Sequence, residues 1–340
     1  MSADATRRWL LLHVGVGLGA ACVAEPDLRG PLPARNQHPA QLTVLHFTPR
    51  STEVLAAGAV RSRTDAAYTS LFLSGTSTSF ANSSSWLMDG EYLRVGTRLG
   101  VGLGAGLELC AELALAHTTG GFLDDFVIDY HDTFGFPDQG RTEAERDRFD
   151  VRAERNGREV WSVSETDAEL LDLPLDLTFQ VTPPGERQLG VAVQAGIELP
   201  TGDAARGFGN GEIDVGAALL LDYRIGGIGL HGSVQHTFAG TPDRYDEAGL
   251  EFGDVTAAGL AAELPLFADL SALVQVTWET SALRRLGPRA TARDQVLLWV
   301  GGRYQPARRW AIEVGFGEDL QGLASPDFTA WAAFVWQPGS

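Results

Sequence analysis

The chain has 340 residues with 44 acidic and 26 basic side chains, a net charge of −18, and every basic residue other than histidine is arginine. This acidic balance argues against a nucleic-acid-binding protein, which needs a basic face. Two cysteines cannot build a disulfide scaffold or a thiolate zinc site, and a hydrophobic content of 44% argues against a wholly disordered chain.

The first residues have the order of a secretory signal peptide. A positive start at 7–8 is followed by an apolar run of 12 residues at 10–21 and by small residues before Glu25. We therefore expect residues 1–24 to be a signal peptide. A short buried helix and a lipoprotein attached through Cys22 are the weaker alternatives.

The next segment, 25–57, has no long periodic run. Its one short apolar stretch, Leu42–Phe47, is long enough for a strand. We expect 25–57 to form an N-terminal periplasmic arm or an extra strand, and an arm that plugs the domain that follows is a further alternative.

Residues 58–340 are a series of segments in which apolar and polar side chains alternate with a period of two. In 171–179, for example, every second residue is Leu or Phe, and the residues between them are Asp, Pro and Thr. The clearest runs are 10 to 14 residues long, whereas an average globular strand has about 5 to 6 residues and a transmembrane strand needs about 9 to 11. Twelve such segments can be counted: 58–73, 87–100, 104–117, 168–181, 187–199, 212–225, 228–239, 252–264, 269–280, 294–305, 309–317 and 327–337.

The connectors between these segments alternate strictly between short and long. Short periplasmic turns and long external loops are typical of bacterial outer-membrane barrels, and an even strand count places both ends of the barrel in the periplasm. The longer connectors are 74–86, 118–167, 200–211, 240–251, 281–293 and 318–326. The pattern predicts an all-β fold, a transmembrane antiparallel up-and-down β-barrel of about 12 strands over 58–340, in the outer membrane of a Gram-negative bacterium.

Four sequence patches carry a resemblance to a known family. They are GPLPARNQHP at 30–39, LMDGEYLRV at 87–95, GGFLDDFVIDYHDTFGFPDQGR at 120–141, and ELPTGD at 198–203 with the following GFGNGEIDVG. Together they resemble a family of Gram-negative proteins known only as a domain of unknown function and predicted to form outer-membrane barrels. The resemblance implies a fold and a location; it implies no activity and no catalytic residues.

Charged side chains on the polar faces of the segments predict a charge ladder in the lumen. A tight turn near 100–104 would set arginines of one segment opposite glutamates of the next, and such pairs stabilise a sheet by about 0.2 to 1 kcal/mol each. The ladder comprises Arg94, Arg98, Glu108, Glu112, Asp172 and Asp176. We interpret it as structural filling of the lumen; a filter that favours cations or polar solutes is the sharper alternative.

The long loop 118–167 contains apolar residues at three- and four-residue spacing, which predicts a short amphipathic helix. The apolar positions are Leu123, Phe126, Val127, Tyr130 and Phe134. An apolar helical face outside the cell must pack on something. We expect it to cover the barrel mouth as a lid, and packing against neighbouring loops is the alternative.

Two further groups of residues suggest chemistry, but neither is predicted to form a site. Asp124, Asp125, Asp129, His131 and Asp132 suggest a metal site with oxygen ligands, but their spacing does not fit a calcium loop, and on a helix the acids point several ways. His231 and Ser233 have a spacing found in some outer-membrane lipid hydrolases, but both fall on the polar face, away from lipid. No cofactor or metal motif is present in the sequence.

We therefore predict a non-enzymatic outer-membrane protein, a narrow gated channel for small solutes. The alternatives are a structural or surface-interaction barrel with a filled lumen and, third, a lipid hydrolase that uses His231 and Ser233. The partners expected from this location are outer-membrane lipid and lipopolysaccharide, the barrel assembly machinery and an unidentified small solute. No nucleic acid is expected.

Overall fold

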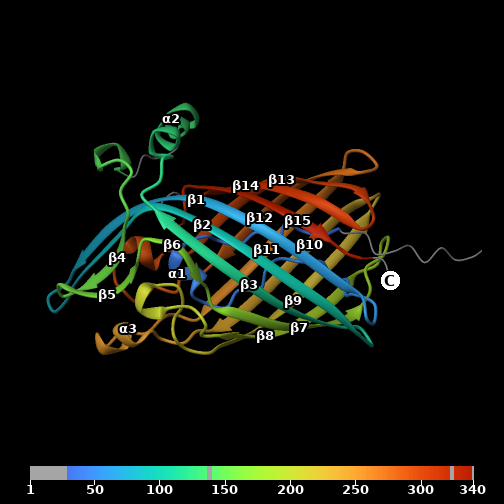
Figure 1. Ribbon diagram of the computed structural model, residues 1–340, viewed down its shortest axis with the longest axis horizontal. Coiled ribbons are helices and arrows are strands. Elements are labelled where there is room, and N and C mark those ends of the chain that lie inside the picture. Colours follow the sequence, from blue (N-terminus) through green and yellow to red (C-terminus); the bar gives the residue numbers. More distant parts are fainter. Residues whose placement is uncertain (1–28, 136–139, 322–324, 339–340) are drawn as a thin grey trace, which may run out of the picture.

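The computed structural model describes residues 29–135, 140–321 and 325–338. The predicted signal peptide, 1–24, and Cys22 lie outside these residues. Twelve strands form the wall of a closed barrel (Figure 1). They are β1 (Val60–Thr78), β2 (Ser83–Gly104), β3 (Leu107–Thr119), β7 (Leu173–Thr182), β8 (Gly190–Leu199), β9 (Asp214–Ile225), β10 (Ile228–Phe238), β11 (Val255–Pro265), β12 (Leu270–Glu279), β13 (Gln295–Ala307), β14 (Trp310–Asp319) and β15 (Phe328–Trp336).

Each wall strand pairs antiparallel with its neighbours in the chain, and β1 pairs with β15 to close the barrel. Closure leaves no unpaired edge inside the wall, which is what a strand protein needs in lipid. The predicted twelve-strand antiparallel barrel is confirmed.

The alternating sequence produces an inside-out barrel. On β7, Leu177 and Phe179 are 41% and 43% exposed, whereas Asp176 and Thr178 between them are 4% and 0% exposed. Apolar side chains therefore point to the lipid and polar side chains to the lumen, as in other membrane barrels. No helix in the described part of the chain is long and apolar enough to cross a membrane.

The two ends of the barrel differ. The turn between β9 and β10 is the pair Gly226–Gly227, and both residues have positive φ, which suits a tight hairpin. Short turns of this kind gather at the end of the barrel where β1 begins and β15 ends (Figure 1). This is the periplasmic end, and the longer loops lie at the external end.

The external end departs from the prediction in two places. β1 and β2 have 19 and 22 residues and are joined by 79–82 alone, so the predicted connector 74–86 is wrong and the hairpin extends beyond the wall. Further strands continue the sheet there, β4 pairing with β2 and β6 pairing with β3. They are β4 (Asp150–Arg155), β5 (Arg158–Val163) and β6 (Thr166–Leu170).

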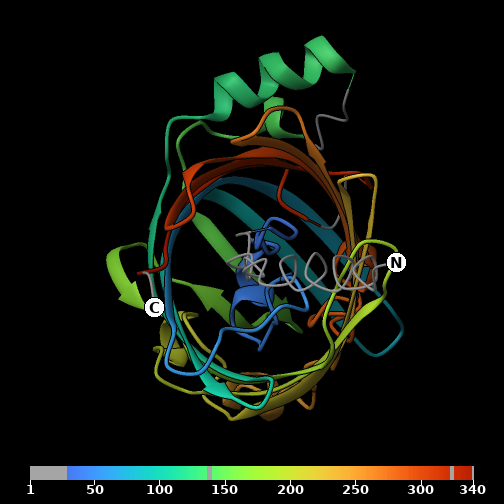
Figure 2. The same ribbon diagram turned by 90° about the vertical axis from the view of Figure 1, so that its right-hand side faces the viewer.

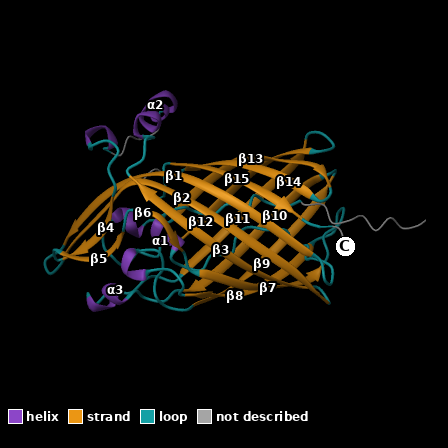
Figure 3. Ribbon diagram, viewed as in Figure 1, coloured by secondary structure: helices purple, strands orange, loops and turns teal. Residues whose placement is uncertain are grey.

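Helices are short and lie toward the external end (Figure 3). They are α1 (Pro39–Leu42), α2 (Asp124–Phe134), α3 (Asp243–Glu247) and α4 (Arg289–Ala292), with 3₁₀ turns at Arg141–Glu143 and Ala204–Arg206.

Residues 29–59, called the plug below, lie inside the barrel (Figure 2, blue). The segment contains α1 and no strand, and most of its residues are buried. The prediction of a periplasmic arm or an extra strand is therefore wrong for these residues. Their polar groups form hydrogen bonds with side chains of the lumen wall and do not pair with the sheet. The plugging alternative describes their position.

Candidate functional site: the plugged lumen

The plug enters the lumen near the periplasmic end. The Gly30 N–H donates to the Glu263 carboxylate at 3.1 Å, and the Arg303 guanidinium donates to the Gly30 carbonyl at 2.9 Å. Further along, the Asn36 amide donates to the carboxylate of Glu279, the last residue of β12. The plug thus runs the length of the barrel, held by wall side chains from β11, β12 and β13.

After α1 the plug returns along β9 and β10, which lie next to β11 in the wall. The Leu45 N–H donates to Asp214 at 2.9 Å, and the Leu45 carbonyl accepts from the Thr237 hydroxyl at 2.8 Å. The Phe47 N–H donates to the Gln235 amide oxygen at 2.7 Å. Buried backbone groups need such partners, and here lumen side chains supply what a neighbouring strand otherwise would.

Asp222 of β9 is the most heavily used wall residue. Its carboxylate accepts from the Ser51 hydroxyl at 2.6 Å, the Thr52 N–H at 2.7 Å and the Thr52 hydroxyl at 2.9 Å. Its other oxygen lies 2.6 Å from Nδ1 of His231. Bonds to a charged acceptor are stronger than neutral ones, so Asp222 is a main anchor of the returning chain.

Charge complementarity also holds the plug. Between 29 and 59 the chain has three arginines and two histidines but one glutamate. Arg50 pairs with Glu108 of β3 at 2.9 Å, and the same carboxylate accepts from the Leu55 N–H at 2.8 Å. The acidic lumen therefore has a basic segment of the same chain as its counter-charge.

An apolar cluster seals the external end above the polar lumen. Leu42 of α1 is buried together with Trp86, Phe208, Tyr245 and Leu283, which come from the β1–β2 hairpin and the external loops. The plug therefore fills the lumen and also forms part of the apolar core of the external loops. Displacement of the plug would open the lumen and remove packing partners from these loops.

The predicted ladder is present in part. Arg98 faces Glu112 in the β2–β3 register, with 3.8 Å between the charged groups, and also pairs with Asp176. Arg94 pairs with Glu112 and, at 2.8 Å, with Asp65 of β1. Four of the six predicted residues therefore meet in one network, to which Asp65 adds a partner that the sequence analysis did not name.

The other two predicted residues are used differently. Glu108 binds the plug, as described above. Asp172 lies outside the ladder, in the chain just before β7, where it accepts from the N–H groups of Gly202 at 2.8 Å and Asn210 at 3.2 Å. Burial raises the pKa of Asp172 to about 6. Asp172 precedes the first residue of β7 and so lies beyond the wall, where its hydrogen bonds hold the 200–213 loop in place.

A second ion network in the lumen was missed. Arg303 pairs with Glu313 at 2.7 Å and with Glu263 at 2.9 Å, and Arg63 reaches Glu313 at 3.2 Å. All four stand on lumen faces of wall strands. The alternation in the segments 294–305 and 309–317 indicates that Arg303 and Glu313 point into the lumen. It does not indicate that Arg63 lies near them, because this depends on the pairing of β1 with β15.

The predicted helix exists as α2, but it is not placed as a lid. Phe126 lies 5.5 Å from Phe328, and Tyr130 lies 6.1 Å from Phe316, measured between ring centroids. Phe316 and Phe328 are on the outward faces of β14 and β15, so α2 rests against the outside of the barrel (Figure 2). The lid interpretation is wrong, because the apolar face of α2 packs on this aromatic patch of the outer wall. The mouth of the barrel is closed instead by the apolar cluster around Leu42.

The remaining apolar positions of the helix behave unequally. Val127 is buried, whereas Phe134 is 66% exposed and Leu123 is the residue at the N-cap. Among the described residues no group of three or more His, Cys, Asp or Glu is placed to hold a metal ion.

His231 and Ser233 make no hydrogen bond with each other in the part of the chain that the structure describes. The Nδ1 atom of His231 faces Asp222, and its Nε2 atom is buried without a partner. Both side chains stand on the lumen face of β10, where the plug, not lipid, is the neighbour. The arrangement gives no support to a lipid hydrolase.

Sequence comparison places this architecture in a family. The family model described as "Protein of unknown function (DUF3187)" matches residues 10–336, which include both the plug and the barrel. The chain belongs to this family. Among curated proteins no match was found.

Solved structures with a similar fold are outer-membrane barrels. An outer-membrane channel from Pseudomonas putida F1 superposes with a TM-score of 0.53 at 13% identity, covering 86% of this chain and 100% of that chain. The NanC porin gives 0.44 at 8% identity, with coverage of 83% and 100%. The toluene transporter TbuX from Ralstonia pickettii gives 0.40 at 9% identity, with coverage of 84% and 90%. Only the first likeness is close enough to support the fold, and it supports the fold alone.

The plug of this family member contains a histidine that must stay neutral. His38 precedes α1, its Nδ1 accepts from the Ala40 N–H at 3.2 Å, and its ring stacks on Trp86 at 5.6 Å. Burial lowers the pKa of His38 to about 4, an effect that the nearby Glu279 only partly offsets. Protonation would place a charge in an apolar site and remove the acceptor for Ala40.

We expect acid to loosen the plug through His38. A histidine with a lowered pKa in the bound state stabilises that state fully above its ordinary pKa of about 6.5, and the contribution is lost as the pH falls toward 4. The loss is on the order of 3 kcal/mol. Trypsin cleavage at plug arginines, expressed relative to cleavage of an unfolded reference peptide at the same pH, should therefore accelerate between pH 6.5 and 5. The His38→Asn variant, which keeps a capping acceptor but does not titrate, should show a smaller acid effect; an equal acceleration in both proteins would contradict the assignment.

Proposed function

We propose that the protein is a gated outer-membrane channel for small solutes whose closed state is the plugged barrel described above. The observation that carries the proposal is the nature of the plug contacts. The plug belongs to no strand of the wall and is held by hydrogen bonds and ion pairs from lumen side chains, so it can leave without breaking the sheet.

The lumen wall supports the same proposal. Its side chains are polar and charged from Arg303 and Glu263 near one end to Asp214 and Glu279 near the other. In a barrel with a purely structural role, the side chains of the wall could fill the lumen by themselves, as they do in narrow barrels. The structural relative from Pseudomonas putida F1 is a channel, which agrees with the proposal at the level of the fold.

The alternative is a structural or surface-interaction barrel that never opens. It is favoured by the apolar cluster that joins α1 to the external loops, because this cluster seals the mouth as a folded core. The two functions differ in one measurable property, the passage of ions or solutes when the plug is absent or displaced.

Single-channel recording in a planar bilayer tests this difference. The full-length protein should be silent or open rarely, and a variant that lacks 30–56 should show steady conductance steps, because the plug residues that bind the wall are gone. A variant that lacks 124–134, the α2 helix on the outer wall, should behave as the full-length protein. Silent bilayers for the plug deletion, with folding confirmed by heat-modifiable migration, would favour the structural barrel instead.

A further inference from the structure

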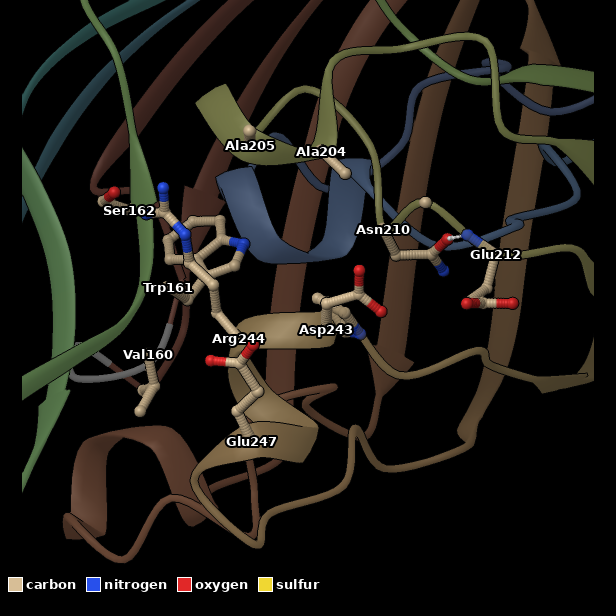
Figure 4. A pocket seen from close by; sticks show the side chains of 12 residues that line it. Val160, Trp161, Ser162, Ala204, Ala205, Asn210, Glu212, Asp243, Arg244 and Glu247 are labelled. Carbon is tan, nitrogen blue, oxygen red and sulfur yellow. Dashed lines mark hydrogen bonds between the residues drawn. The ribbon is translucent and has the colours of Figure 1, made fainter.

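A hollow of about 310 Å³ opens among the external loops, outside the barrel lumen (Figure 4). Its lining comes from β5, from the 200–213 loop and from α3. This volume is at the lower end of the range for small-molecule sites, roughly 300 to 1,000 Å³, and suits a ligand the size of a monosaccharide. None of the contacts that hold the plug lies in it.

The ionisable groups around this hollow leave a negative excess. Arg244 pairs with Glu159 at 3.2 Å, and Glu247 pairs with Arg158. Two other carboxylates of the lining, Glu212 and Asp243, have no ion-pair partner within the described residues. Asp243 and Glu212 come from different loops, so the fold brings two uncompensated acids to one cavity.

A buried donor faces the same hollow. Trp161 is only 3% exposed, yet its Nε1–H has no hydrogen-bond partner among the described residues. Figure 4 shows the nitrogen edge of the ring turned to the side on which Asn210 and Asp243 lie. Buried indole N–H groups usually find an acceptor, and a ligand that turns the ring toward the hollow can supply one.

The protein groups nearby are already engaged. The Asn210 amide donates to Asp214 at 2.9 Å, and its oxygen accepts from the Glu212 N–H at 2.8 Å. The Ser162 hydroxyl donates to Glu159 at 2.7 Å. The hollow therefore offers a ligand two exposed carboxylates, which attract a positive group, and an indole N–H that lacks an acceptor.

The floor of the hollow is continuous with the plug. The Trp161 ring stacks on Trp86 at 5.6 Å, and Trp86 stacks on His38 of the plug at 5.6 Å, between ring centroids. A ligand that reorients Trp161 would therefore act through Trp86 on His38, the N-cap residue of α1. This stack places the hollow at the external entrance of the proposed channel.

We propose that this hollow is an external binding site for a monosaccharide-sized solute that carries an ammonium group beside hydroxyl groups, such as an amino sugar. The ammonium group binds between Glu212 and Asp243, and a ring hydroxyl accepts from the Trp161 N–H. The inference rests on the proposed channel function for its biological purpose, but binding itself needs only the closed protein.

Isothermal titration calorimetry on the full-length, detergent-refolded protein tests the site. D-Glucosamine should bind about tenfold or more tightly than D-glucose, because charge-assisted hydrogen bonds form only with the amine, and D-glucuronate should not bind. The double variant Glu212→Gln/Asp243→Asn should lose the preference for glucosamine. Glu251→Gln is the matched control, since Glu251 lies on the same loop as Asp243 but pairs with Arg285.

Trp161→Phe separates the indole from the carboxylates. It keeps a ring for the stack on Trp86 but removes the N–H, so it should weaken both sugars while the ratio between them stays the same. Equal affinities for glucose and glucosamine, absence of heat for all three sugars, or an equal loss in the Glu251→Gln control would overturn the site. Absence of binding would leave the conductance of the plug deletion untouched, and binding without conductance would remove the channel but keep the site.

Discussion

Replacing Asp222 by Asn is expected to release the returning half of the plug and to open the lumen. Asp222 is 1% exposed and receives three hydrogen bonds from Ser51 and Thr52 while its second oxygen faces His231. Asparagine is neutral, so the hydrogen bonds from Ser51 and Thr52 lose their charge assistance, and an NH₂ group turned toward them would meet a donor. The expected loss is about 3 kcal/mol, or roughly a hundredfold in the equilibrium between bound and released plug.

Two measurements check this expectation on the same protein. Single-channel open probability should rise by about two orders of magnitude, and trypsin should reach Arg50, which is held in the lumen in the native protein. Asp167→Asn is the matched control, because Asp167 is an exposed residue of β6 and belongs to none of the plug contacts described above. An open probability and a cleavage pattern equal to the control would contradict the role of Asp222 as an anchor.

Replacing Arg303 by Met is expected to destabilise the barrel itself. Arg303 is 2% exposed and stands between Glu263 and Glu313, which are 2% and 0% exposed. Breaking a buried pair by removing one partner costs about 3 to 5 kcal/mol, because a charge remains in a poor environment without compensation. Arg63 still reaches Glu313, so the larger part of the loss should fall on Glu263.

Urea unfolding of the protein refolded into lipid vesicles measures this free energy. Arg309→Met is the control, because Arg309 is exposed in the β13–β14 turn, and such surface changes usually stay within about 0.5 kcal/mol. The double variant Arg303→Met/Glu263→Gln should recover part of the loss, since it also removes the orphaned carboxylate. Equal unfolding free energies for Arg303→Met and Arg309→Met would contradict the network.

The wall of the barrel was predictable because lipid imposes one rule on every strand. A residue such as Leu177 that faces lipid must be apolar, and its neighbour Asp176 faces a polar lumen, so the period of two survives along the whole sequence. The length of the segments then separates a membrane strand from a soluble one. The extension of β1 and β2 beyond the wall was not predicted, because this part of the hairpin lies outside the membrane, where outward-facing residues need not be apolar.

The plug was not predictable in the same way. Its chain forms no strand, so its backbone groups bind wall side chains such as Asp214 and Gln235. No local sequence pattern predicts such partners. The charge of the segment was a usable signal, because a basic stretch and an acidic lumen are complementary.

The α2 helix shows a second limit. Spacing predicted its apolar face, but amphipathicity does not say which surface that face meets. The partner surface is formed by Phe316 and Phe328, whose outward direction follows from strand register and not from their own sequence neighbourhood.

A reversible covalent lock on the plug tests the central claim most directly. A Cβ atom added at Gly315 of β14 would lie 3.1 Å from Cδ1 of Leu32 in the plug, so the thiols of Leu32→Cys/Gly315→Cys lie close enough to be joined by a short reducible crosslinker. The pair is introduced into the Asp222→Asn protein together with Cys110→Ser, which removes the free native thiol. We predict a silent bilayer for the crosslinked protein and conductance steps after reduction of the same channel. The same conductance before and after reduction would show that the plug does not gate the barrel.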